Sequence, residues 1–139
     1  MRLTPRSSRS LDLARREALG LGAAEIGTAH LLLGLAEEGR ESGDPLLADV
    51  DPDRVRGLLP LRRRAGAPPL SPCAAASLAA AARRARGGAV DVAHLLAAVL
   101  GYPSSSAVGV LERLGLDAGH LWVRAGADVA APTPLLVRR

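Results

Sequence analysis

The sequence contains very few aromatic residues and no lysine. Tyr102 and Trp122 are its only aromatics, and phenylalanine is absent. A single-strand nucleic-acid binder stacks bases on several aromatic rings, so this composition argues against such a partner. All 18 basic side chains are arginines, and against 14 acidic ones they leave a formal charge of +4, too small to indicate a nucleic-acid surface. Without lysine, the chain cannot carry a phosphate-loop lysine, a Schiff-base amine or a lysine general base.

Cysteine and long apolar runs are equally scarce. Cys73 is the only cysteine, so no internal disulfide can form, and a thiolate metal site would need companions at defined spacing. We therefore expect no metal, no cofactor and a reducing, intracellular setting. The first residues contain no signal-peptide core, and no segment approaches the roughly 20 apolar residues that cross a bilayer. These features predict a cytoplasmic protein.

The apolar residues that are present follow a helical period. Leu11, Ala14 and Ala18 lie on one helical stripe after Thr4-Pro5, which is a favoured N-cap and first helical residue. No segment alternates with period two over a convincing length, so we expect no sheet. The expected helices span about 5–19, 28–39, 45–50, 52–59, 72–86, 92–100, 105–114 and 118–128.

The second half of the sequence repeats the first. Residues 70–72 (LSP) repeat 3–5 (LTP), 90–96 (VDVAHLL) align with 26–32 (IGTAHLL), and 117–121 (DAGHL) align with 51–55 (DPDRV). We interpret this as an internal duplication. It predicts a single all-α domain over 1–139 with about eight helices in two pseudo-repeated four-helix motifs. Repeat one spans about 3–59, a linker 60–69, repeat two about 70–128 and a mobile tail 129–139.

These motifs resemble a known family. A Thr-Pro helix start, the segment 26–35 (IGTAHLLLGL) and the segment 51–56 (DPDRVR), all duplicated, look like the N-terminal repeat of Clp-type unfoldase chaperones such as ClpC and ClpA. The resemblance covers roughly 3–128 and is specific in the first copy, whereas the second copy is degenerate. It implies a double Clp N-terminal domain, which serves in that family as a mobile receptor for substrates and adaptor proteins.

The resemblance also implies a function that does not include nucleotide hydrolysis by this chain. No G-x-x-x-x-G-K motif follows the repeats, and no G-x-S-x-G motif or nucleophile with an adjacent base is present. We therefore expect a stand-alone module that is not an enzyme, binds proteins or peptides, and acts in trans as a regulator or decoy of a Clp chaperone–protease system. Its partner would be a Clp ATPase, an adaptor or a substrate.

Candidate binding residues follow from the same resemblance. Clp unfoldases that bind arginine-phosphorylated substrates have a Thr at the first helix start of each repeat and a Glu before the His of the second helix. Here Thr4 and Ser71 keep the hydroxyl, which can hold a phosphoryl group at a helix N-terminus or act only as an N-cap. Ala29 and Ala93 replace the Glu, which removes the carboxylate that would pair with a guanidinium. Glu25 is the nearby acid that can substitute in the first site.

Two alternative functions remain open. The chain can be a decoy that sequesters cyclic-peptide toxins, although Leu3 and Leu70 stand where the family usually has an aromatic, which weakens a stacking site. A less favoured alternative is a basic, nucleic-acid-associated helical protein. The arginine runs 62–64 and 83–86 can contact an acidic partner or form a solvated face.

The histidines and the tryptophan have structural interpretations. His30 and His94 recur once per repeat, and we expect each to hydrogen-bond the backbone of its own half, not to bind a metal. Trp122 is expected at the edge of the core, with an interface hot spot as the alternative.

Overall fold

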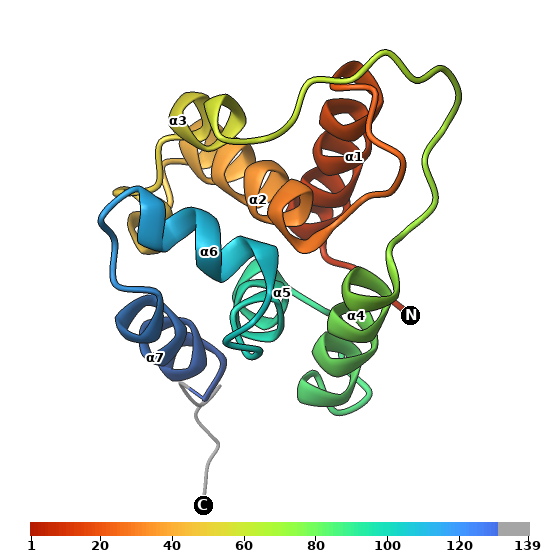
Figure 1. Cartoon of the computed structure of the whole chain (residues 1–139). Helices are drawn as coiled ribbons and strands as arrows, with labels where there is room; N and C mark the ends of the chain where they lie inside the picture. Colours follow the sequence, from red (N-terminus) through yellow and green to blue (C-terminus); the bar gives the residue numbers. More distant parts are fainter. Residues whose placement is uncertain (131–139) are drawn as a thin grey trace, which may run out of the picture.

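The computed structural model describes residues 1–130, and every regular element in that range is helical (Figure 1). This confirms the all-α fold with about eight helices. Apart from helices, the described residues form only two isolated β-bridges. The elements are α1 (Pro5–Gly20), α2 (Thr28–Ser42), the 3-10 helix η1 (Pro45–Leu47), α3 (Pro52–Gly57), α4 (Pro72–Arg84), α5 (Val92–Val99), α6 (Ser106–Arg113) and α7 (Ala118–Ala130).

Several helix starts follow the predicted capping residues. At the starts of α1, η1, α3 and α4, a hydroxyl or carboxylate precedes a proline, and the side chain accepts a hydrogen bond from an otherwise unpaired N–H of the first turn. Thr4 accepts from the Ser7 N–H at 3.2 Å, and Ser71 accepts from the Ala74 N–H at 3.0 Å. Asp51 caps α3 in the same way.

Two predicted helix ends are wrong. The helix expected over 45–50 is only the 3-10 turn η1, which ends at Leu47. Gly39 was expected to end the second helix, but α2 continues to Ser42 and ends at Gly43, which adopts a left-handed conformation with φ of 70°. Gly39 instead lies buried within α2, where an added Cβ would come within 2.9 Å of the Leu47 Cβ. A glycine is needed at this position because α2 packs closely against η1, and not because the chain reverses direction there.

The core is one continuous cluster to which both repeats contribute. α2 lies at its centre and packs against α1, α3, α4, α5, α6 and η1, as Figure 1 shows for most of these neighbours. The largest side chains with less than 2% exposure are mainly leucines of α2 and α5, and the fully buried set contains no aromatic residue. These leucines are Leu32, Leu33, Leu35, Leu95 and Leu96.

The two repeats exchange contacts at their helix starts. Leu3, before α1, forms a parallel bridge with Val90, before α5, while Leu70, before α4, pairs with Ile26, before α2. The first helix of each repeat therefore begins beside the second helix of the other repeat. As a result, a site at either helix start combines residues from both repeats.

The linker 60–69 has no helix and runs from α3 past the end of α1 to α4 (Figure 1). It is attached at both ends, because the Arg62 N–H donates to the Leu21 carbonyl at 2.7 Å and the Ile26 N–H donates to the Pro69 carbonyl at 2.7 Å. At the other end of the chain, α7 extends two residues into the predicted mobile tail 129–139, and residues 131–139 lie outside the described part. None of the described helices is long and apolar enough to span a membrane.

Candidate ligand-binding site

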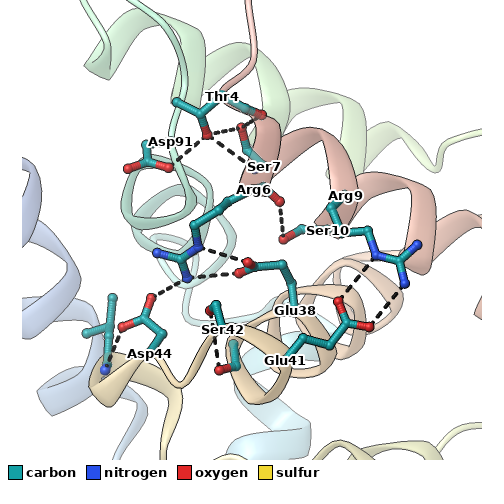
Figure 2. A network of polar contacts seen from close by, with 12 residues as sticks. Thr4, Arg6, Ser7, Arg9, Ser10, Glu38, Glu41, Ser42, Asp44 and Asp91 are labelled. Carbon is teal, nitrogen blue, oxygen red and sulfur yellow. Dashed lines mark hydrogen bonds and ion pairs between the residues drawn. The ribbon is translucent and has the colours of Figure 1, made fainter.

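The hydroxyl of Thr4 is engaged by the protein itself (Figure 2). Besides capping α1, it donates a hydrogen bond to the Asp91 carboxylate at 2.8 Å and lies 2.9 Å from the Ser7 hydroxyl. Asp91 is the N-cap residue of α5, so this contact is a consequence of the exchange between repeats. A phosphoryl group at this helix start would face a carboxylate, and the geometry therefore favours capping over anion binding at Thr4.

The neighbouring arginine is also occupied. Arg6 donates from Nε and Nη2 to the two Glu38 carboxylate oxygens, at 2.8 Å each, and from Nη2 to Asp44 at 2.6 Å (Figure 2). The hydrogen bonds to Glu38 raise the pKa of Arg6 despite its partial burial. Because Glu38 is buried and its charge needs this partner, Arg6 ties α1 to the end of α2 and is not free to hold an external anion.

Ser71 has a different environment from Thr4. It lines a depression of about 390 Å³ that also includes Glu25, Ala29 and Arg62, so the hydroxyl of the second repeat and the Ala29 position of the first repeat share one cavity. Glu25 thus borders the depression that contains the position of the lost family carboxylate. Hydroxyl, carboxylate and guanidinium groups together make the depression suitable for a small polar group.

The depression contains one residue that sequence reasoning missed. The Ser106 hydroxyl accepts a hydrogen bond from the Ala29 N–H at 3.2 Å and lies 2.9 Å from the Thr28 hydroxyl. It therefore caps the start of α2 from α6. No local pattern marks Ser106, because 77 residues separate it from Ala29 and only the packing of α6 on α2 brings them together.

The remaining residues of the predicted site are apolar, and their side chains contribute no polar contact. Leu3 is half-buried against the core, whereas Leu70 is 41% exposed. Ala29 is buried at the start of α2, and Ala93 is half-buried at the equivalent place in α5. The two helix starts are therefore not equivalent, because Ser71 itself lines a depression, whereas the depression at the start of α1 is lined by Leu3 and Pro5 and not by Thr4.

The two histidines have the predicted backbone role. Nδ1 of His30 accepts from the Gly27 N–H at 3.0 Å, and Nδ1 of His94 accepts from the Asp91 N–H at 2.9 Å. Burial lowers the pKa of both imidazoles. Each histidine thus closes the first turn of its own helix in the neutral form, which confirms the prediction. Across the described residues, no three His, Cys, Asp or Glu side chains are grouped so that they could hold a metal ion.

Sequence comparison finds relatives of the first repeat. Residues 1–56 match the family described as the Clp repeat (R) N-terminal domain. Over 55 residues, the chain is 40% identical to the chloroplastic chaperone protein ClpD1 of Oryza sativa subsp. japonica and 44% identical to chloroplastic ClpC of Pisum sativum. These alignments span 40% and 38% of the chain but only 6% of each relative's length.

Structural comparison extends the similarity to both repeats. The fold resembles the N-terminal domain of the caseinolytic-protease-associated chaperone ClpD from Arabidopsis thaliana, with a TM-score of 0.77, 25% identity, and coverage of 93% of this chain and 95% of that one. The chain carries a Clp N-terminal domain. The Hsp104 N-terminal domain of Candida albicans has the same fold, with a TM-score of 0.72 over 90% of this chain and 89% of its own, at 15% identity. The degenerate second repeat of this Clp N-terminal domain is thus recognised by its structure.

Within repeat one of this Clp N-terminal domain, Arg56 joins α1, α2 and α3. Its guanidinium donates to Glu17 at 3.0 and 2.7 Å and to Asp53 at 2.7 Å, and it lies 3.4 Å from Glu37. The hydrogen bonds from Arg56 lower the pKa of Glu17. Burial, followed by the neighbouring Glu17, raises the pKa of Glu37 to about 7. One arginine therefore joins three carboxylates, and one of these carboxylates titrates near neutrality.

The raised pKa of Glu37 predicts a pH-dependent stability. The pKa of Glu37 rises from an ordinary 4.5 to about 7, so between these values the folded state binds more protons than the unfolded state. The contribution of Glu37 to the free energy of unfolding is fully present below pH 4.5 and is lost as the pH rises to about 7. As the pH rises through this window, the free energy of unfolding of Glu37→Gln is expected to increase by about 1–3 kcal/mol relative to that of wild type, as measured by urea denaturation.

The matched control for this prediction is Glu41→Gln on the same helix. Glu41 is exposed and pairs with Arg9, and its pKa is lowered. Removing the Glu41 carboxylate should therefore give no increase in the free energy of unfolding relative to wild type between pH 4.5 and 7. His30 and His94, whose lowered pKa values act in the opposite direction, are present in every variant and cancel in the differences. A constant difference between Glu37→Gln and wild type across this pH range would contradict the prediction.

The equivalent space in repeat two is an open groove. It has a volume of about 470 Å³, lies between the end of α5, α6 and the start of α7, and has mostly apolar walls. Trp122, predicted at the core edge, is 41% exposed and borders this groove, and Tyr102 is 43% exposed in the adjoining loop. The groove bordered by an aromatic side chain is therefore in the second repeat.

The arginine runs at 62–64 and 83–86 are exposed, and their guanidinium groups form no ion pair with an acid of the described residues.

Proposed function

We propose that this Clp N-terminal domain is a non-catalytic module that binds proteins or peptides and acts in trans as a regulator or decoy of a Clp chaperone–protease system. The similarity of both repeats to the N-terminal domain of the protease-associated chaperone ClpD supports the proposal. Its expected partners are a Clp ATPase, an adaptor or a substrate of that system. We further propose that Ser71, not Thr4, contributes to ligand binding, because it borders the depression shared with Ala29 and Glu25.

The proposal is tested by adding the purified chain to a reconstituted Clp ATPase and peptidase from the organism that makes it. A regulator or decoy should change the rate at which a model unfolded protein is degraded, and the change should saturate with the concentration of the chain. Affinity capture from lysate with the same chain as bait, followed by mass spectrometry, should enrich a Clp ATPase or its adaptors. An unchanged degradation rate together with no captured Clp component would contradict the proposal.

The contribution of Ser71 is tested with Ser71→Asp, which keeps a capping oxygen at the start of α4 and adds a negative charge to the depression. An anionic or carboxylate-bearing partner should be captured less well by this variant. Ala76→Asp, an exposed change on α4 outside the depression, provides the matched control for the added charge. Equal capture by the two variants would remove Ser71 from the binding site while leaving the proposed function intact.

A further inference from the structure

The open groove in repeat two corresponds to the ion-pair cluster in repeat one. Arg56 and Trp122 each lie five residues after an aspartate that caps the first turn, Asp51 and Asp117 respectively. A Cβ added at Gly101 would lie 3.8 Å from the Trp122 indole nitrogen. The indole therefore packs over Gly101.

The partners of Arg56 have lost their carboxylates in repeat two. Counting from the helix starts and the repeated histidines, Glu37 corresponds to Gly101, Asp53 to Gly119 and Glu17 to Arg84. In repeat one these carboxylates surround the guanidinium, and the depression of about 520 Å³ beside them is lined by charged residues that include Arg40, Asp51 and Asp53. In repeat two the substitutions leave an indole beside two glycines, and the groove of about 470 Å³ there has mainly apolar walls. The duplication thus contains a charged version and an apolar version of the same depression.

The charges of the groove indicate what would fill it. Glu112 and Asp117 are its only ionisable lining residues, and neither forms an ion pair within residues 1–130. Between them lie the apolar surfaces of Leu100, Val108, Leu116 and Trp122. An apolar wall with an acidic rim complements a ligand that has an aliphatic part next to a positive charge.

We propose that the groove beside Trp122 binds a short peptide segment in which aliphatic side chains are followed by a lysine or arginine. The aliphatic side chains enter the groove and lose their contact with water, which supplies most of the affinity. The basic side chain stays at the rim beside Glu112 and Asp117, where it selects the segment and contributes less, because the charges remain exposed. This proposal rests on the proposed function and names the class of segment that such a module would select.

The test uses the intrinsic fluorescence of Trp122, which is the only tryptophan in the chain. The probe is the peptide Ser-Ala-Leu-Ile-Lys-Arg-Ser-Gly, which contains no aromatic residue, titrated into the full chain. We expect a saturable change in Trp122 emission. Replacing Leu-Ile by Ser-Ser should weaken binding by about tenfold or more, because the buried aliphatic area is lost. Replacing Lys-Arg by Glu-Glu should weaken it by about three- to tenfold.

A matched pair of charge variants separates the groove from general electrostatics. Glu112→Lys reverses one rim charge and should raise the dissociation constant of the Lys-Arg peptide by about three- to tenfold. Asp49→Lys makes the same change in net charge at an exposed residue outside the groove and should leave the dissociation constant unchanged. Trp122→Ala, followed with a fluorescently labelled peptide, should weaken binding by about tenfold, whereas Val123→Ala on the exposed face beside it should not.

Several results would overturn this assignment. Equal affinity for the three peptides, equal weakening by Glu112→Lys and Asp49→Lys, or no change in Trp122 emission would each exclude it. A dimer in analytical ultracentrifugation that dissociates in Trp122→Ala would show that a second copy occupies the groove. If the chain alters Clp degradation but no peptide affects Trp122, the proposed function stands and the groove assignment fails. If the peptides bind as expected but degradation is unaffected and no Clp component is captured, the groove assignment stands and the in-trans role fails.

Discussion

Gly34→Ala is expected to lower the free energy of unfolding by about 3 kcal/mol, because two helix backbones meet at this position. A Cβ at Gly34 would lie 2.2 Å from the Ser10 carbonyl oxygen and 2.9 Å from the Ala14 Cβ. The Ser10 oxygen belongs to the backbone of α1 and cannot rotate away, so α1 and α2 would have to separate. Their contact is the most extensive between any two described helices, so the strain acts on the centre of repeat one.

The control for this prediction is Gly109→Ala in α6. A Cβ at Gly109 meets no atom within 4 Å, so the substitution brings only the higher helix propensity of alanine. We expect it to stabilise the domain by about 0.5–1 kcal/mol. Urea denaturation followed by circular dichroism measures both variants. Similar unfolding midpoints for Gly34→Ala and wild type would show that α1 and α2 do not approach so closely.

Leu32→Ala is expected to lower the free energy of unfolding by about 2–5 kcal/mol. Leu32 is fully buried in α2, at 0% exposure, and α2 contacts both repeats, so neighbouring side chains can collapse only partly into the cavity. Its counterpart in the second repeat, Leu96, is also at 0% exposure and should show a loss of similar size. Equilibrium unfolding in urea again provides the measurement.

Leu19→Ala serves as the control for the two core variants. Leu19 is 49% exposed at the end of α1, and its truncation should change the free energy of unfolding by less than about 0.5 kcal/mol. A loss below about 1 kcal/mol for Leu32→Ala would contradict the burial of this face of α2. A large loss for Leu32→Ala with none for Leu96→Ala would show that the repeats do not share one core.

The helices were predictable because their signals are local. Thr4-Pro5, Asp51-Pro52 and Ser71-Pro72 each place a capping oxygen and a proline at a helix start, and these signals act within one turn. The predicted role of His30 and His94 was confirmed for the same reason, since each bonds a backbone N–H only three residues away. Gly39 misled the prediction because a helix-ending glycine and a glycine required by packing look the same in sequence.

The candidate site was predictable only in part. The sequence identified Thr4 and Ser71 as equivalent hydroxyls, but the structure makes them different, since Asp91 occupies the first and an open depression borders the second. The contribution of Ser106 and the groove beside Trp122 depend on contacts between segments far apart in the chain. No local pattern encodes such contacts.

The amino-acid sequence by itself determined the helical class, the helix starts, the duplication and the absence of a lysine-based chemistry, because capping, periodicity and composition are properties of short segments. The tertiary structure decided how the repeats combine. The pairing of Leu3 with Val90 and of Leu70 with Ile26 places each helix start beside the other repeat. The tertiary structure also decided that equivalent positions differ in use, because Arg56 forms ion pairs in one repeat while Trp122 borders an apolar groove in the other. Contacts of this kind are set by the packing of distant helices around a common core.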